Sequence, residues 1–129
     1  MATIFTKIIS GEIPSHKIHE NEKFLAFLDI NPLKAGHTLV VPKQEIDYVF
    51  DLPDDLLSEI LVFSKQVARK IESVVDCERI GISVIGLEVP HAHVHLIPMN
   101  SVSDMNFSKP KLDLDSQYMA DLAEKIRQA

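Results

Sequence analysis

The segment His91-Ala92-His93-Val94-His95-Leu96-Ile97-Pro98 alternates imidazole and apolar side chains. Successive side chains of a β-strand point to opposite faces, so the pattern predicts a strand with His91, His93 and His95 on one face. Neighbouring rings on that face would lie roughly 6.6 Å apart, and the apolar face would pack in a core. Three successive polar positions give up hydrophobic burial, which indicates a functional role for these histidines.

The rest of the chain provides a sheet for this strand. Apolar residues recur at helical spacing from Leu56 to Val75, which predicts one long amphipathic helix with an acidic start. The other predicted elements are a short helix at 4–10, strands at 16–20, 23–29, 38–41 and 79–85, a loop at 101–113 and a last helix around 119–126. Strands that arrive mostly as hairpins around one crossover favour an α+β fold, with a five-stranded, mostly antiparallel sheet and the long helix packed across it.

Length and composition limit the organisation and the partners of the chain. With 129 residues, 46% of them hydrophobic, we predict a single domain, with a core at about 4–98 and a C-terminal loop and helix at 99–129. A net charge of −6 argues against a nucleic-acid partner. Neither an export signal nor a membrane span is visible, so the expected location is the cytoplasm.

The alternating histidines fit two kinds of chemistry. For zinc, the outer pair would lie roughly 13 Å apart, too far to share one ion, so two of the histidines would need a further ligand such as His37 or Glu88. In the other chemistry, a neutral imidazole attacks phosphorus while flanking imidazoles donate hydrogen bonds to phosphate oxygens and assist the leaving group. The central His93, with a neighbour on each side, fits this second chemistry better.

The segment Glu88–Pro98 resembles the signature of the histidine triad (HIT) family. Segments 4–14, 27–32 and 36–43 resemble the Hint branch of that family in order and spacing. The resemblance covers roughly residues 4–98. It implies a HIT-like fold, a homodimer joined through the long helix and the fourth strand, and catalysis without a metal or any other cofactor.

The resemblance also implies a role for each matching residue. His93 matches the nucleophile that takes the nucleotidyl group, His91 and His95 match its phosphate-contacting partners, and His37 matches a supporting histidine. Asp29 matches a carboxylate that binds the ribose hydroxyls. The nucleotide-binding set is completed by Ile4, Phe5, Ile8, Phe27 and Ile30 around the nucleoside, and by the backbone N–H of Val89 beside the phosphate. Glu88 stands near the position of a phosphate-contacting hydroxyl residue in the Hint branch, where its carboxylate would either repel phosphate or bind an amine leaving group.

Some positions depart from the family pattern. Leu87 stands where glutamine is usual, and the loop before it is short and lacks an Asn-x-Gly segment. Thr3 and Thr6 stand where some relatives place a zinc-binding cysteine pair, so we expect no structural zinc.

The sequence therefore predicts a nucleotide hydrolase that splits a purine nucleoside 5′-phosphoramidate, or a related conjugate, at the α-phosphorus through a nucleotidyl-histidine. Three alternatives stay open: a diadenosine polyphosphate hydrolase, a nucleotide-binding regulatory dimer with weak catalysis, and a metal enzyme that uses two of the triad histidines. The expected partners are a purine nucleotide and a second copy of the chain.

Overall fold

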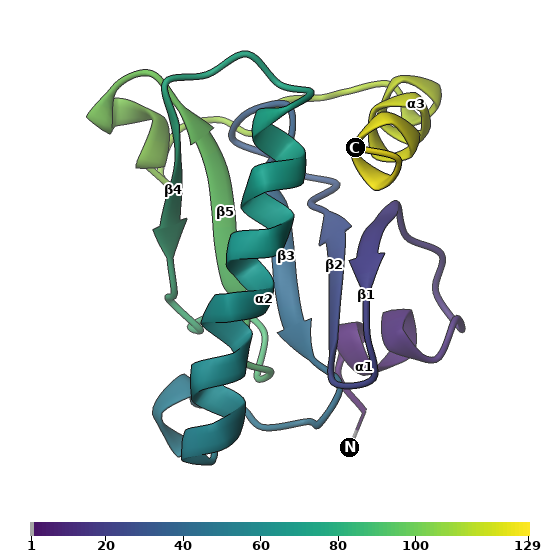
Figure 1. Cartoon of the computed structure of the whole chain (residues 1–129), viewed down its shortest axis with the longest axis vertical. Helices are drawn as coiled ribbons and strands as arrows, with labels where there is room; N and C mark the ends of the chain where they lie inside the picture. The colour runs from purple at the N-terminus through teal and green to yellow at the C-terminus, as the bar shows by residue number, and fades with distance from the viewer. Residues whose placement is uncertain (1) are drawn as a thin grey trace.

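Five strands form one sheet in the order β1-β2-β3-β5-β4, and every neighbouring pair is antiparallel. The computed structural model describes residues 2–129 (Figure 1). In chain order the elements are α1 (Ile4–Ile9), β1 (Lys17–Glu20), β2 (Phe24–Leu28), β3 (Thr38–Pro42), η1 (Val49–Asp51), α2 (Asp54–Glu72), β4 (Arg79–Ser83), β5 (Val94–Met99), η2 (Val102–Met105) and α3 (Ser116–Arg127). The predicted α+β fold is confirmed.

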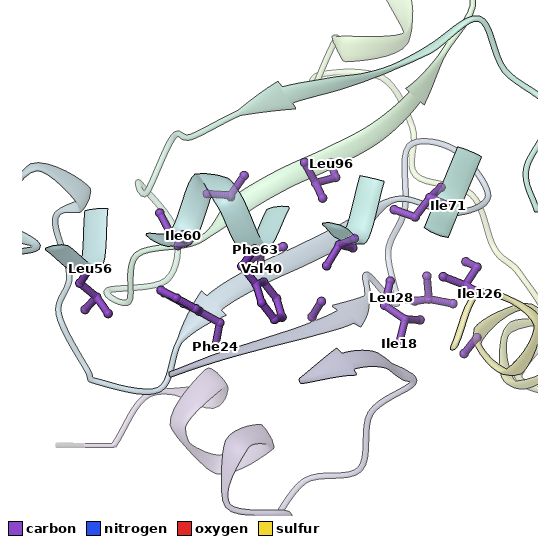
Figure 2. Close-up of a cluster of buried hydrophobic side chains, with 14 of the residues drawn as sticks. Ile18, Phe24, Leu28, Val40, Leu56, Ile60, Phe63, Ile71, Leu96 and Ile126 are labelled. Atoms are coloured by element: carbon purple, nitrogen blue, oxygen red, sulfur yellow. The ribbon is translucent and has the colours of Figure 1, made fainter. Parts of the chain in front are cut away.

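The two faces of the sheet carry separate apolar clusters. Phe24, Ala26 and Leu28 of β2 point to the side of α2, where Phe63 and other residues of that helix cover them (Figure 2). The intervening residues of β2, Leu25 and Phe27, point to the other side, where they pack with α1. Each fully buried side chain of this size contributes roughly 1.5–3 kcal/mol of hydrophobic free energy, so both faces hold the sheet in place.

The strand that carries the histidines begins later than predicted. The expected strand was 91–98, whereas β5 begins at Val94, so His91 and His93 lie in the segment that leads into it. The N–H of His91 donates to Val89 O at 2.8 Å and that of Ala92 donates to Ile46 O at 2.7 Å. These bonds take the backbone out of the sheet ladder before β5.

Other boundaries differ by less. β4 ends at Ser83 rather than at residue 85, and the expected loop 101–113 contains the short helix η2. None of the helices within residues 2–129 has the length and apolar character needed to cross a lipid bilayer.

Candidate active site

His93 is held in one tautomer by the main chain. Its Nδ1 lies 2.8 Å from His91 O, and a carbonyl only accepts, so Nδ1 carries the proton and donates. Nε2 is then left with a free lone pair. Burial lowers the pKa of His93, although the bond to the His91 carbonyl opposes that effect. The ring is therefore neutral near pH 7 and presents Nε2 as a nucleophile.

A second chain of hydrogen bonds orients His95. The backbone N–H of Leu33 donates to Nδ1 of His37 at 3.0 Å, which makes that nitrogen an acceptor and places the proton of His37 on Nε2. His37 Nε2 lies 3.0 Å from His95 Nδ1 and donates to it. His95 therefore carries its own proton on Nε2. The centroid of its ring is 5.0 Å from that of His93, so the ring that keeps a lone pair lies beside the ring that keeps an N–H donor.

Burial keeps His37 and His95 neutral. Their rings are almost inaccessible to solvent. Desolvation, with a smaller effect of the neighbouring His95, lowers the pKa of His37 from 6.5 to about 3. Desolvation, with smaller effects of His93 and Lys111, lowers the pKa of His95 from 6.5 to about 4. At neutral pH His95 thus acts as a hydrogen-bond donor rather than as a cation.

His91 has a different environment from its two neighbours. Its exposed fraction is 0%, and both ring nitrogens have partners within the chain. Nε2 donates to Pro42 O at 2.8 Å, and Nδ1 lies 2.9 Å from Thr3 Oγ1. The family resemblance implies that His91 contacts phosphate, whereas in this structure its ring connects the start of α1 to the end of β3.

The apolar residues expected around the nucleoside gather between α1 and the sheet. Phe5, Ile8 and Phe27 belong to one buried cluster, and half-buried Val89 packs against it. The ring of Phe5 meets the ring of His93 edge-on, with centroids 5.0 Å apart.

The remaining predicted binding residues lie near the surface. Ile4, Ile30 and Glu88 are exposed. Asp29 follows β2, where Oδ1 accepts the N–H of Asn31 at 2.9 Å and Oδ2 lies 3.6 Å from His37 Nε2. Burial raises the pKa of this carboxyl.

Phe107 is a neighbour of the site that sequence reasoning did not identify. The centroid of its ring is 4.8 Å from that of His95 and 6.2 Å from that of His37. The ammonium of Lys111 lies 5.9 Å from the Phe107 centroid, and its charge contributes to the lowered pKa of both histidines. The only signal in the sequence was an isolated aromatic residue within a segment of no clear period.

Asp29, His37 and His95 have the spacing of a metal site but unsuitable proton positions. One ligand atom from each residue lies within 4.8 Å of the others. A metal at His37 Nε2 would displace the proton there, and the proton would have to move to Nδ1. That nitrogen already accepts the N–H of Leu33, so the new Nδ1–H and the Leu33 N–H would point at each other without an acceptor between them. These residues fit a hydrogen-bonded relay better than a metal centre.

Two surface hollows of the molecule do not coincide with the histidine site. Surface hollows of about 430 and 470 Å³ lie elsewhere, one between the β1–β2 turn and α2, the other between the end of α2 and α3. Neither of these hollows is lined by a histidine, so the site is assigned from the chemistry of its side chains.

Comparison with known proteins agrees with this arrangement. Residues 10–102 match the family model described as HIT domain. An uncharacterised HIT-like protein of Borreliella burgdorferi is 34% identical over 131 residues, covering 95% of this chain and 94% of the relative. The adenosine 5′-monophosphoramidase HNT1 of Candida albicans is 34% identical over 135 residues, covering 97% and 89%. A solved Zn-bound histidine triad family protein from Mycobacterium smegmatis aligns with a TM-score of 0.85 at 27% identity, covering 99% and 92%.

Three alternating histidines that lead into β5 of a five-stranded antiparallel sheet define a class of proteins, the histidine triad proteins. The chain belongs to the HIT-domain family. The family expected from the histidine pattern is thereby confirmed.

Proposed function

We propose that this chain hydrolyses purine nucleoside 5′-phosphoramidates at the α-phosphorus, with His93 as the nucleophile. The observation that carries the proposal is the pair of fixed tautomers. His93 presents the lone pair of Nε2 because Nδ1 donates to His91 O, and the adjacent His95 presents an N–H because Nδ1 accepts from His37. Similarity to a protein named adenosine 5′-monophosphoramidase supports the choice of substrate.

The reaction proceeds in two displacements. His93 Nε2 attacks phosphorus, and the P–N bond breaks with its electron pair going to the leaving nitrogen. That nitrogen takes a proton from solvent and departs as the amine. The nucleotidyl-imidazolium keeps its Nδ1–H on the His91 carbonyl, which stabilises the new positive charge. Water then attacks phosphorus, the P–Nε2 pair returns to the ring, and the nucleoside monophosphate is released with a proton lost to solvent.

His95 acts on the phosphate rather than on the nucleophile. Its Nε2–H would donate to a non-bridging oxygen and stabilise the negative charge of the phosphoryl group in the transition state. Since the ring is buried and neutral, this hydrogen bond operates in a region of low dielectric constant and is stronger than it would be in water. His37 holds the ring in the tautomer that makes the donation possible.

The nucleoside is assigned to the α1 side of the sheet. The edge of the Phe5 ring lies against His93, so a base packed beside Phe5, Ile8 and Phe27 would bring the 5′-phosphorus to Nε2. The Asp29 carboxylate, still partly exposed, would accept the ribose hydroxyls. Ile4, Ile30, Glu88 and Val89 would complete the rim.

The test is turnover of adenosine 5′-phosphoramidate, with release of AMP followed by chromatography and the adduct on the protein followed by mass spectrometry. His93→Gly is expected to abolish both turnover and adduct, whereas His16→Gly, a histidine substitution outside the site, should retain both. Full turnover by His93→Gly would contradict the proposal. Calorimetric AMP binding without turnover by the wild type would favour the regulatory alternative, and preferential cleavage of diadenosine polyphosphates would change the substrate.

We also propose that the chain forms a homodimer through β4 and α2. β4 is an edge strand of the sheet, with Ile82 exposed there, and α2 exposes Leu61 and Val62. An unpaired edge beside exposed apolar side chains is a typical surface for self-association. Light scattering after gel filtration should give twice the mass of the 14.5 kDa chain. Ile82→Lys should reduce the measured mass to that of one chain. A wild type with the mass of one chain would exclude the proposed interface through β4 and α2.

A further inference from the structure

We propose that Glu45, Thr6 and Thr3 are positioning residues for the nucleophile: they hold His91, whose backbone carbonyl in turn holds His93. The inference rests on the proposed role of His93. None of the three side chains is hydrogen-bonded to His93, so their effect on it passes through His91 and, for Thr3, also through the cap of α1.

The direction of every hydrogen bond in this group follows from a count of protons. His91 Nε2 donates to the Pro42 carbonyl, so its Nδ1 is an acceptor and must receive the hydroxyl proton of Thr3. The hydroxyl of Thr6 donates to Glu45 Oε1. Each hydroxyl has one proton, so the 3.2 Å approach of the two threonine oxygens is a contact without a hydrogen bond.

Two backbone donors close the arrangement. The N–H of Thr3 donates to Glu45 Oε1 at 3.2 Å, and the N–H of Thr6 donates to Thr3 Oγ1 at 3.0 Å. Glu45 therefore holds both threonines, and Thr3 passes this constraint to His91. The bonds from Thr6 and Thr3 lower the pKa of Glu45, so its carboxylate remains ionised and a strong acceptor at neutral pH.

The same hydroxyl serves two parts of the site. Thr3 is the N-cap of α1, the helix that brings Phe5 against His91 and His93. It also fixes the ring of His91, which is fully buried between Thr3 and Pro42 at the end of β3, where Figure 1 places the start of α1. Because His91 lies just before β5 and outside the sheet ladder, its side chain supplies the restraint that strand pairing does not.

The position of the His93 ring depends on its hydrogen bond to the His91 carbonyl. The bond from His93 Nδ1 to His91 O is 2.8 Å long and determines which nitrogen attacks phosphorus. Loss of the Thr3 bond would leave the His91 ring held only through Nε2 on the Pro42 carbonyl, so the ring could tilt and its backbone could shift. A displacement of a reacting group by about 1 Å costs on the order of 100-fold in rate, so a partial loss of restraint should cost about tenfold.

The experiment compares pairs of variants that remove or retain one donor or acceptor. Thr3→Val, Thr6→Val and Glu45→Met are each expected to lower kcat about tenfold with KM nearly unchanged. Thr3→Ser, Thr6→Ser and Glu45→Gln, which keep the hydroxyl or the acceptor oxygen, should restore kcat to within about twofold of wild type. Glu12→Met, at an exposed glutamate near the end of α1, is the control and should leave kcat unchanged.

A second readout needs no substrate. Nitrogen NMR of the histidine rings should show His91 protonated at Nε2 and His93 protonated at Nδ1 in the wild type. In Thr3→Val the Nδ1 resonance of His91 should shift because that nitrogen loses its hydrogen-bond donor, while the Nε2 proton stays on the Pro42 carbonyl. The His93 Nδ1 proton should exchange faster with water. Thr6→Val, which leaves the N-cap of α1 intact, should produce the same change in smaller degree.

The two readouts separate this inference from the proposed function. The positioning role would be overturned if folded Thr3→Val and Thr6→Val proteins had the same ring spectra and the same kcat as the wild type. If instead the wild type turns over no nucleotide, the proposed function fails, while the ring spectra of His91 and His93 in the wild type and the variants still decide the inference.

Discussion

Lowering the pH from 6 to 5 is expected to reduce the free energy of unfolding by about 2.5 kcal/mol, because His37 and His95 are buried as neutral rings. Their pKa values in the fold are about 3 and about 4, both below the 6.5 of an exposed histidine. Between those values the unfolded chain takes up protons that the folded chain does not, so stability falls as pH falls. Each ring contributes up to about 1.4 kcal/mol per pH unit in this window. His93, whose pKa is also lowered, adds to the loss, and Asp29, whose pKa is raised, opposes it.

Urea unfolding at pH 6 and pH 5, at one protein concentration and one ionic strength, measures this loss. Most carboxylates titrate near pH 4 in the unfolded chain and so contribute little between these values. His95→Gln removes one buried ring and should reduce the loss between pH 6 and pH 5 by about 1.2 kcal/mol. Gln66→Ala, at an exposed position of α2 that does not titrate, should leave it unchanged. An unfolding free energy equal at both pH values, or the same dependence in the two variants, would refute the assignment of neutral rings.

Three further predictions concern single side chains around the site. Phe107→Ala should raise the pKa of His95 from about 4 toward 6.5 by admitting water, and a proton NMR titration of the ring would show an unchanged midpoint if Phe107 does not shield it. Glu88→Gln should lower KM for an anionic nucleotide about twofold at low salt and have no effect at high salt, since the exposed carboxylate would repel the phosphate. Gly36→Ala should cost about 1–3 kcal/mol of stability in urea unfolding, because φ is +95° and a Cβ would lie 3.1 Å from two side-chain carbons; Gly86→Ala, also at positive φ but with open space around it, should cost less.

The elements predicted from sequence are those that a local pattern specifies. The helical spacing from Leu56 to Val75 indicated α2, and the close spacing of two extended runs indicated the β1–β2 hairpin. The triplet of alternating histidines indicated the site, because Val94 and Leu96 had to enter a core while His95 faced away from it. Each of these inferences needs only neighbouring residues and the geometry of one element.

The features that were missed depend on contacts between distant parts of the chain. Glu45 meets Thr3 across 42 positions, and Thr3 meets His91 across 88, so no spacing within one element points to either pair. The start of β5 was placed too early because the alternation of residues continues through His91, although its backbone has already left the ladder. Phe107 lies in a loop whose course is set by tertiary contacts, such as the bond from the Leu112 N–H to the Pro32 carbonyl.

The chemistry of the site depends on main-chain atoms as much as on the histidines. A neutral imidazole offers a donor and an acceptor, and the residue type does not decide which nitrogen is which. Here the Leu33 N–H fixes which nitrogen of His37 carries the proton, and His37 in turn fixes it for His95. The His91 carbonyl fixes the protonated nitrogen of His93. Three histidines on a strand without these two backbone groups would present lone pairs and protons in several combinations. The site therefore needs the turn that follows β2 and the segment that precedes β5, because these two irregular segments convert a row of equivalent rings into one nucleophile and one donor.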